Sequence, residues 1–358
     1  MAQQPARRAG ALAAATAFAL TGCTLVSGTG DGGQDTVGAP DQGGTVVLVT
    51  HNSFALPDEL VAAFEQETGL TLQVSALGDA GTMVNQLVLT KDDPVGDVVF
   101  GIDNTFASRA VDAGVLAPST TALPPGAEQY LVGDSGLVPV DVGDVCVNAD
   151  LRWFDERGLD LPATLEDLAD PAYRGLLVVQ NPATSSPGLA FALATIGAFG
   201  EDGWLGYWQR LVDNDVQVAA SWEDAYYAGF SGPSSEGDRP LVVSYASSPP
   251  FEVGEGEGEA PTAALLETCF RQVEYAGVLA GADNPTGAQQ VLDWLLSAEV
   301  QAAIPEHMYV YPVDDSVPLP QAWAQFAPPA PSPFTVDPAD VAANRDAWIQ
   351  DWTATVVG

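Results

Sequence analysis

Basic residues are scarce in this chain of 358 residues. Lysine and arginine together number 11 against 48 aspartates and glutamates, the formal net charge is -37, and Lys91 is the only lysine. Nucleic-acid binding depends on cationic side chains that neutralise phosphates, so this composition argues against a nucleic-acid partner. The acidity favours solubility and would suit a cationic ligand, but a diffuse charge identifies no site.

Histidine is rarer still, with only His51 and His307. Neither has a cysteine or a second histidine at the spacing of a zinc site, so we expect no metal centre. The chain also lacks a nucleophile elbow, a phosphate-binding glycine loop and a dinucleotide fingerprint. These absences favour a binding protein without a cofactor, and an exported enzyme is the least favoured alternative.

Cysteine occurs only at Cys23, Cys146 and Cys269. The last two lie in strand-like runs, at 143–148 and 268–276. Export would place them in a compartment that permits oxidation, so a disulfide between Cys146 and Cys269 is expected. The sequence does not give the Cα separation that the bond requires, which leaves two free thiols as the alternative.

The N-terminal residues have the pattern of a lipoprotein signal. Arg7 and Arg8 precede an uncharged, alanine-rich run, and Leu-Thr-Gly-Cys follows at 20–23. We therefore expect a signal peptide at 1–22, a lipid on Cys23 and a flexible, glycine-rich tether over 23–44. A plain secretory peptide with an incidental cysteine is the alternative. Either reading makes the protein extracytoplasmic, and a lipid on Cys23 would anchor it to the cell membrane.

Strand and helix patterns alternate through the rest of the chain, which predicts an α/β fold with parallel strands and crossover helices. About 315 residues follow the tether, more than one core usually organises, so two lobes are expected. The strand-like patterns are at 45–50, 70–76, 97–101, 176–180, 216–219, 241–245 and 271–278, and the helical patterns are at 58–68, 81–89, 187–199, 203–213, 285–296 and 337–352.

The order of these patterns predicts where the lobes divide. Residues 45–142 and about 274–320 would form lobe 1, residues 143–273 would form lobe 2, and residues 321–358 would be a helical segment that packs on the lobes. The chain would cross between the lobes twice, which would make a two-strand hinge beside the ligand cleft.

Aromatic and small polar residues recur where predicted strands end, which is where open α/β sheets bind ligands. Thr184-Ser185-Ser186 precedes a helix start at Pro187, so Ser185 could bind a phosphate with its hydroxyl and nearby backbone N–H groups, or it could only cap the helix. Asp103-Asn104 follows a strand, and we include Asn104 among the candidate ligand residues.

Eight ordered runs and the final helix resemble the thiamine-binding proteins of ABC importers, from Thr45 to Trp352. The runs are T-H-N-S-F (50–54), A-L-G-D (76–79), D-V-V-F-G-I-D-N (97–104), V-P-V-D-V-G (138–143), N-P-A-T-S-S-P-G-L (181–189), S-W-E-D-A-Y (221–226), V-S-Y-A-S-S-P (243–249) and I-P-E-H-M-Y-V-Y-P-V (304–313). The resemblance implies a monomeric two-lobed receptor of the periplasmic-binding-protein fold (type II), which closes on thiamine or its phosphate esters and delivers it to a permease and ATPase.

The same resemblance implies roles for particular residues. Trp222 matches a tryptophan that lies against the ligand, Tyr245 matches a pocket tyrosine, and Asp79 matches a carboxylate near the ligand. The alternatives are core packing for Trp222 and simple helix capping for Asp79.

Three positions depart from the family pattern but keep a flat ring. His51 and Phe251 each stand where the family has a tyrosine, and Tyr309 stands where it has a tryptophan. Stacking is therefore retained while hydrogen bonding changes. A neutral His51 could stack on a cation, whereas a protonated one would repel it, so binding is expected to weaken at low pH. A structural strand-end histidine is the alternative for His51.

Two other receptors of the same fold stay open. Tyr226-Tyr227 could supply phenolates to ferric iron, although neighbours on a helix diverge by about 100 degrees. A polyamine receptor would also use acidic and aromatic groups.

Overall fold

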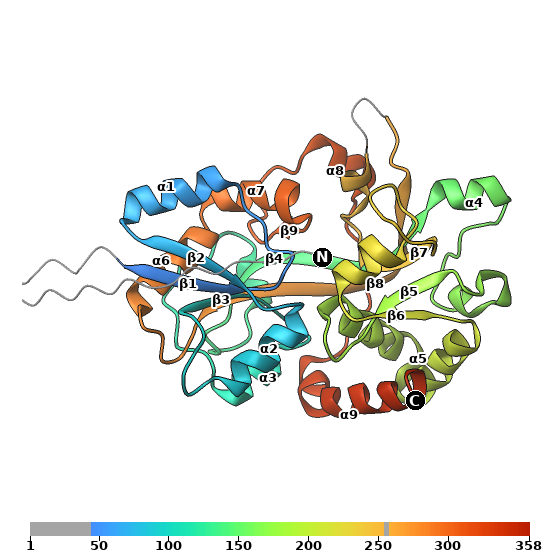
Figure 1. The fold of residues 1–358 in the computed structure, drawn as a ribbon, viewed down its shortest axis with the longest axis horizontal. Coiled ribbons are helices and arrows are strands. Elements are labelled where there is room, and N and C mark those ends of the chain that lie inside the picture. Colours follow the sequence, from blue (N-terminus) through green and yellow to red (C-terminus); the bar gives the residue numbers. More distant parts are fainter. Residues whose placement is uncertain (1–43, 254–257) are drawn as a thin grey trace, which may run out of the picture. The chain divides into compact units, whose positions relative to one another are not determined.

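Three parallel strands form one end of the sheet in the computed structural model, which describes residues 44–253 and 258–358. β1 (Thr45–Thr50) pairs with β2 (Thr71–Ala76) on one side and with β3 (Val98–Asp103) on the other. The crossover helices are α1 (Asp58–Thr68) and α2 (Ala80–Leu89), and α3 (Ala107–Ala113) follows β3. Figure 1 shows α1 on one side of these strands and α2 and α3 on the other. The predicted strand and helix alternation is confirmed here.

Two long antiparallel strands join this group to the rest of the sheet. β4 (Val138–Asp150) and β8 (Thr262–Val278) pair along most of their length. The C-terminal end of β8 pairs with β3. The C-terminal end of β4, which lies at the opposite end of the β4–β8 pair, pairs with β7. The sheet order is β2-β1-β3-β8-β4-β7-β5-β6, and β9 (Tyr311–Pro312) pairs with β4. The chain thus crosses between two groups of strands twice, while the lobe boundaries themselves stay predictions.

The second group consists of β5 (Leu177–Gln180), β6 (Gln217–Ala219) and β7 (Leu241–Tyr245), with parallel pairing on both sides of β5. α4 (Leu151–Arg157) follows β4, and α5 (Ser186–Asp213) packs against the second group. α5 is broken at Gly200, whose φ of 68° is left-handed. Glycine adopts this conformation without a Cβ clash. The break agrees with the two separate helical patterns, at 187–199 and 203–213, that the sequence predicted.

The C-terminal helices are α6 (Pro285–Leu295), α7 (Ala298–Met308), α8 (Gln321–Phe326) and α9 (Pro338–Val356). The side chain of Asp337 caps α9 by accepting from the Ala339 N–H. Trp352 of α9 is fully buried, with its ring centroid 5.3 Å from that of Trp208 in α5. α9 also contacts α3, so the C-terminal helix touches elements next to both strand groups.

Short helical turns complete the fold and are η1 (Ala127–Tyr130), η2 (Asp167–Ala169), η3 (Pro171–Tyr173), the π-helical η4 (Asp224–Gly229) and η5 (Pro249–Glu252). Cys146 in β4 and Cys269 in β8 form a disulfide with a Cα–Cα distance of 4.1 Å. Within the described ranges, every helix is too short or too polar to cross a bilayer. The predicted signal peptide (1–22), Cys23 and the tether to residue 43 lie outside the described residues.

Candidate functional site

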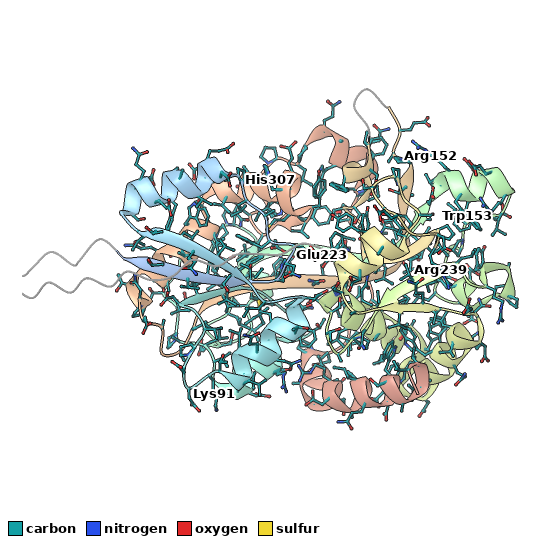
Figure 2. All side chains as sticks on the ribbon, viewed as in Figure 1. Lys91, Arg152, Trp153, Glu223, Arg239 and His307 are labelled. Atoms are coloured by element: carbon teal, nitrogen blue, oxygen red, sulfur yellow. A yellow bond between two sulfur atoms is a disulfide. The ribbon has the colours of Figure 1, made fainter. Side chains whose placement is uncertain are left out.

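A cavity of about 280 Å³ lies where the strand ends of both groups meet. Its volume is close to the lower end of the range for small-molecule sites. The lining residues are His51, Asn52, Ser53, Phe54, Ala55, Asp79, Ala80, Ser186, Pro187, Ser221, Trp222, Glu223, Tyr226, Tyr227, Tyr245, Ser248, Phe251, Glu274, His307, Met308, Tyr309 and Val310. Figure 2 labels Glu223 near the centre of the molecule. Six of the predicted ligand residues are in this set: His51, Asp79, Trp222, Tyr245, Phe251 and Tyr309.

Trp222 forms an aromatic wall together with Tyr226. The two rings are stacked, with centroids 5.0 Å apart and planes at 23°. The Trp222 Nε1–H donates to Ser244 Oγ at 3.0 Å, which fixes the orientation of the indole. Trp222 is only partly buried and lines the cavity, so one part of its ring packs on Tyr226 while another is available to a ligand.

Phe251 and Tyr309 form a second aromatic group, with ring centroids 5.1 Å apart in an edge-to-face arrangement. Tyr309 ends α7 in the left-handed conformation, with φ of 53°. This conformation is uncommon for a residue with a large side chain, and the Ser247 hydroxyl supports it by donating to the Tyr309 carbonyl at 2.5 Å. The result is a ring held at the cavity by the turn after α7.

Asp79 does two things at once. Its carboxylate caps α2 by accepting from the Ala80 N–H at 2.7 Å, and it also accepts from the Trp222 N–H at 2.8 Å and the Ser186 N–H at 3.3 Å. Three backbone donors from three segments therefore converge on one carboxylate. The capping role and the cavity-lining role, which the sequence posed as alternatives, coexist.

A row of three acidic residues on adjacent strands reaches the cavity through its central member, Glu274. Glu274 of β8 is 6% exposed and lies between Asp103 of β3 and Asp141 of β4, its register partners on the two neighbouring strands. The Nε2 atom of His51 lies 3.5 Å from Oε1 of Glu274. Asp79, Glu223 and Glu274 all line the cavity, whereas none of its described lining residues is a lysine or an arginine.

The pKa values of this region follow from burial and from the density of carboxylates. Burial raises the pKa of Asp103 to about 6 despite hydrogen bonds from Ser186 and Thr105. Burial, followed by the negative charge of Glu274, holds the pKa of Asp141 well above its ordinary value. Burial alone would lower the pKa of His51, but Glu274, Asp79 and Asp103 outweigh it and the pKa is raised.

Two predicted site residues do not line the cavity. The Asn104 side chain is used by the sheet, because it donates to the Arg271 carbonyl at 3.1 Å and accepts from the Val273 N–H at 3.1 Å. Ser185 is fully buried, and its hydroxyl has no hydrogen-bond partner among the described residues. Its neighbour Ser186 lines the cavity instead and donates its hydroxyl to Asp103.

Several lining residues were missed from the sequence. Glu274 lies in none of the quoted runs and reaches the cavity only because β8 lies beside it, whereas Ser248 belongs to the run at 243–249 and lines the cavity from the turn after β7. Glu223 follows Trp222 in the run at 221–226, and that run and its place after a strand were the signals that could have identified it. It accepts from the Asn52 amide at 3.3 Å, across the cavity.

The fold and this cavity define a solute receptor, and residues 93–336 match the family of bacterial extracellular solute-binding proteins. The chain belongs to this family. It is 31% identical over 317 residues to the thiamine-binding periplasmic protein of Escherichia coli (strain K12), covering 87% of this chain and 93% of that protein.

Solved structures give the same fold. A periplasmic thiamin binding protein superposes with a TM-score of 0.76 at 29% identity, covering 87% of this chain and 96% of that one. Iron-bound HitA from Pseudomonas aeruginosa superposes with a TM-score of 0.63 at 20% identity, covering 86% and 99%. The chain thus has the expected two-lobed periplasmic-binding-protein fold (type II).

Proposed function

We propose that this protein is an extracytoplasmic receptor for thiamine that delivers the vitamin to an ABC importer. The observation that carries the proposal is a cavity with aromatic walls and three lining carboxylates, without lysine or arginine among its described lining residues. Thiamine joins an aminopyrimidine to a cationic thiazolium. An indole face attracts such a cation by about 0.5 to 2 kcal/mol, and the carboxylates supply the opposite charge.

The transport partners and the anchor belong to the same proposal. The receptor would act as a monomer, exchange thiamine with the permease of an importer powered by its ATPase subunits, and stay near them through a lipid on Cys23. It would need no cofactor. Thiamine phosphates would be weaker ligands at the start of α5, because the Ser186 N–H there already donates to the carboxylate of Asp79, which also accepts from the backbone N–H of Trp222 before η4.

A ferric-iron receptor is less consistent with this cavity. Tyr226 is buried and its hydroxyl donates to Glu252 at 2.7 Å, and burial raises the pKa of the phenol. A phenolate ligand at Tyr226 would therefore be costly to form. A polyamine would use the carboxylates but would leave the stacked rings without a flat partner.

Titration of the mature chain with thiamine, followed by tryptophan fluorescence, tests the proposal. We expect a saturable change at micromolar thiamine or below, because Trp222 faces the ligand. Ferric iron and spermidine are the matched comparisons in the same assay. Saturation by either of them, with no response to thiamine, would reject the thiamine assignment.

A further inference from the structure

We propose that Glu274 is the residue that selects for the positive charge of the ligand, a role that rests on the proposed function. Glu274 lies on β8 where the chain crosses between the strand groups, and it is the only lining residue placed in register with acidic side chains on both neighbouring strands. Its carboxylate is the central member of a row that consists of Asp103, Glu274 and Asp141.

The three neighbouring acidic side chains of this row destabilise the fold of the ligand-free protein. Register partners on adjacent strands have Cβ atoms about 5 Å apart, and like charges directly opposite destabilise a sheet. All three residues are at most 6% exposed, so water screens them poorly. Three pairings offset part of the cost: Glu274 has His51 at 3.5 Å, the Gln272 amide at 3.3 Å and a hydrogen bond with the carboxyl group of Asp141.

The two outer members differ from Glu274 in what they contact. Asp103 accepts hydrogen bonds from Thr105, Phe106 and Ser186, and it does not line the cavity. The carboxyl group of Asp141 is fully buried, and the charge of Glu274 and a side-chain hydrogen bond to Glu274 raise its pKa, which favours a protonated, neutral Asp141 that donates to Glu274. Glu274 alone combines exposure to the cavity with a charge that protein groups only partly balance.

A cationic ligand would neutralise the remaining negative charge of Glu274. Four side chains face Glu274 directly: His51 after β1, Asp103 of β3, Asp141 of β4 and Gln272 of β8 itself. The Tyr245 hydroxyl of β7 lies behind Gln272 and donates to it at 3.2 Å. His51 is the only group among them that can carry a positive charge. A thiazolium above Glu274 would therefore supply what the site lacks, and an uncharged ring of similar size would not.

The test compares Glu274→Gln with Glu67→Gln, a matched control that removes an exposed carboxylate on α1, outside the cavity lining. Isothermal titration with thiamine is expected to show at least tenfold weaker binding for Glu274→Gln and a change below threefold for Glu67→Gln. Titration with thiochrome, an uncharged thiamine derivative, should show a change below threefold for both variants. Equal thiamine affinity in Glu274→Gln and the wild type would overturn the proposal.

Two further variants separate charge from packing. Glu274→Asp keeps the charge and should bind thiamine more tightly than Glu274→Gln, whereas a purely structural role predicts the reverse because aspartate leaves more empty space. Asp141→Asn replaces a neutral acid by a neutral amide and should stay within threefold of the wild type. If the wild type itself does not bind thiamine, the proposed function fails; if it binds and Glu274→Gln is unaffected, only the role of Glu274 fails.

Discussion

Single side chains in this receptor serve the fold and the cavity together. Trp222 packs on Tyr226 with one part of its ring and donates to Ser244, so its indole is oriented before any ligand arrives. Asp79 is similar, because one carboxylate caps a helix and ties two other segments to it. Preorganisation of this kind reduces the ordering cost of binding.

The contribution of Trp222 can be measured by truncation. Trp222→Ala should weaken thiamine binding at least tenfold, since it removes the face that would contact the cation and loosens the stack on Tyr226. Titration calorimetry is the suitable assay because the substitution also removes the fluorescent reporter. Trp222→Phe is the control and should recover part of the affinity. Wild-type affinity in Trp222→Ala would assign the residue to the core alone.

At the scale of elements, the helix N-termini next to the cavity decide which charges it accepts. The N-terminus of α5 has a partial positive charge that could attract a phosphate, yet Asp79 accepts from its Ser186 N–H. The sequence predicted an anion site at Ser185 from local chemistry. It could not show that a carboxylate 106 positions earlier would reach the same turn.

Replacement of that carboxylate tests the competition. Asp79→Asn keeps one oxygen that can cap α2 but replaces the other acceptor by an N–H₂ group, so one of the three backbone N–H groups loses its partner and stability should fall by about 1 to 3 kcal/mol. The ratio of thiamine monophosphate affinity to thiamine affinity should rise at least tenfold, because the ester no longer meets a fixed negative charge. Parallel titrations with both ligands measure this ratio. A ratio that stays at the wild-type value would show that Asp79 does not set the preference.

The sequence predicted local elements better than their assembly. The strand at 45–50 and the helix at 58–68 match β1 and α1, because apolar periodicity is a local signal. The patterns at 143–148 and 271–278 captured only parts of β4 and β8. Their remaining lengths are set by pairing with each other, and the sequence does not show long-range partners. The same limit hid Glu274, whose role depends on its neighbours across β3 and β4.

For the whole molecule, buried acids tie stability to pH. Asp103 has a pKa near 6 in the folded protein and an ordinary value of 3.8, so between these values the folded state holds a proton that the unfolded state has lost. Stability then falls as pH rises from about 4 to above 6, by about 3 kcal/mol at about 1.4 kcal/mol for each pH unit. Asp141 and His51, with raised pKa values, act in the same direction.

We therefore expect the ligand-free protein to melt at a higher temperature at pH 5 than at pH 8. The surface charge of a chain with net charge -37 contributes in the same sense, because self-repulsion grows as carboxylates ionise. Melts in 1 M NaCl separate the two causes, since a Debye length of about 3 Å screens the surface but not the buried row. Asp103→Asn, which cannot ionise, should reduce the remaining dependence between pH 5 and 7 and leave the part that Asp141 and His51 contribute. A higher melting temperature at pH 8 in high salt would show that the buried acids are already ionised without cost.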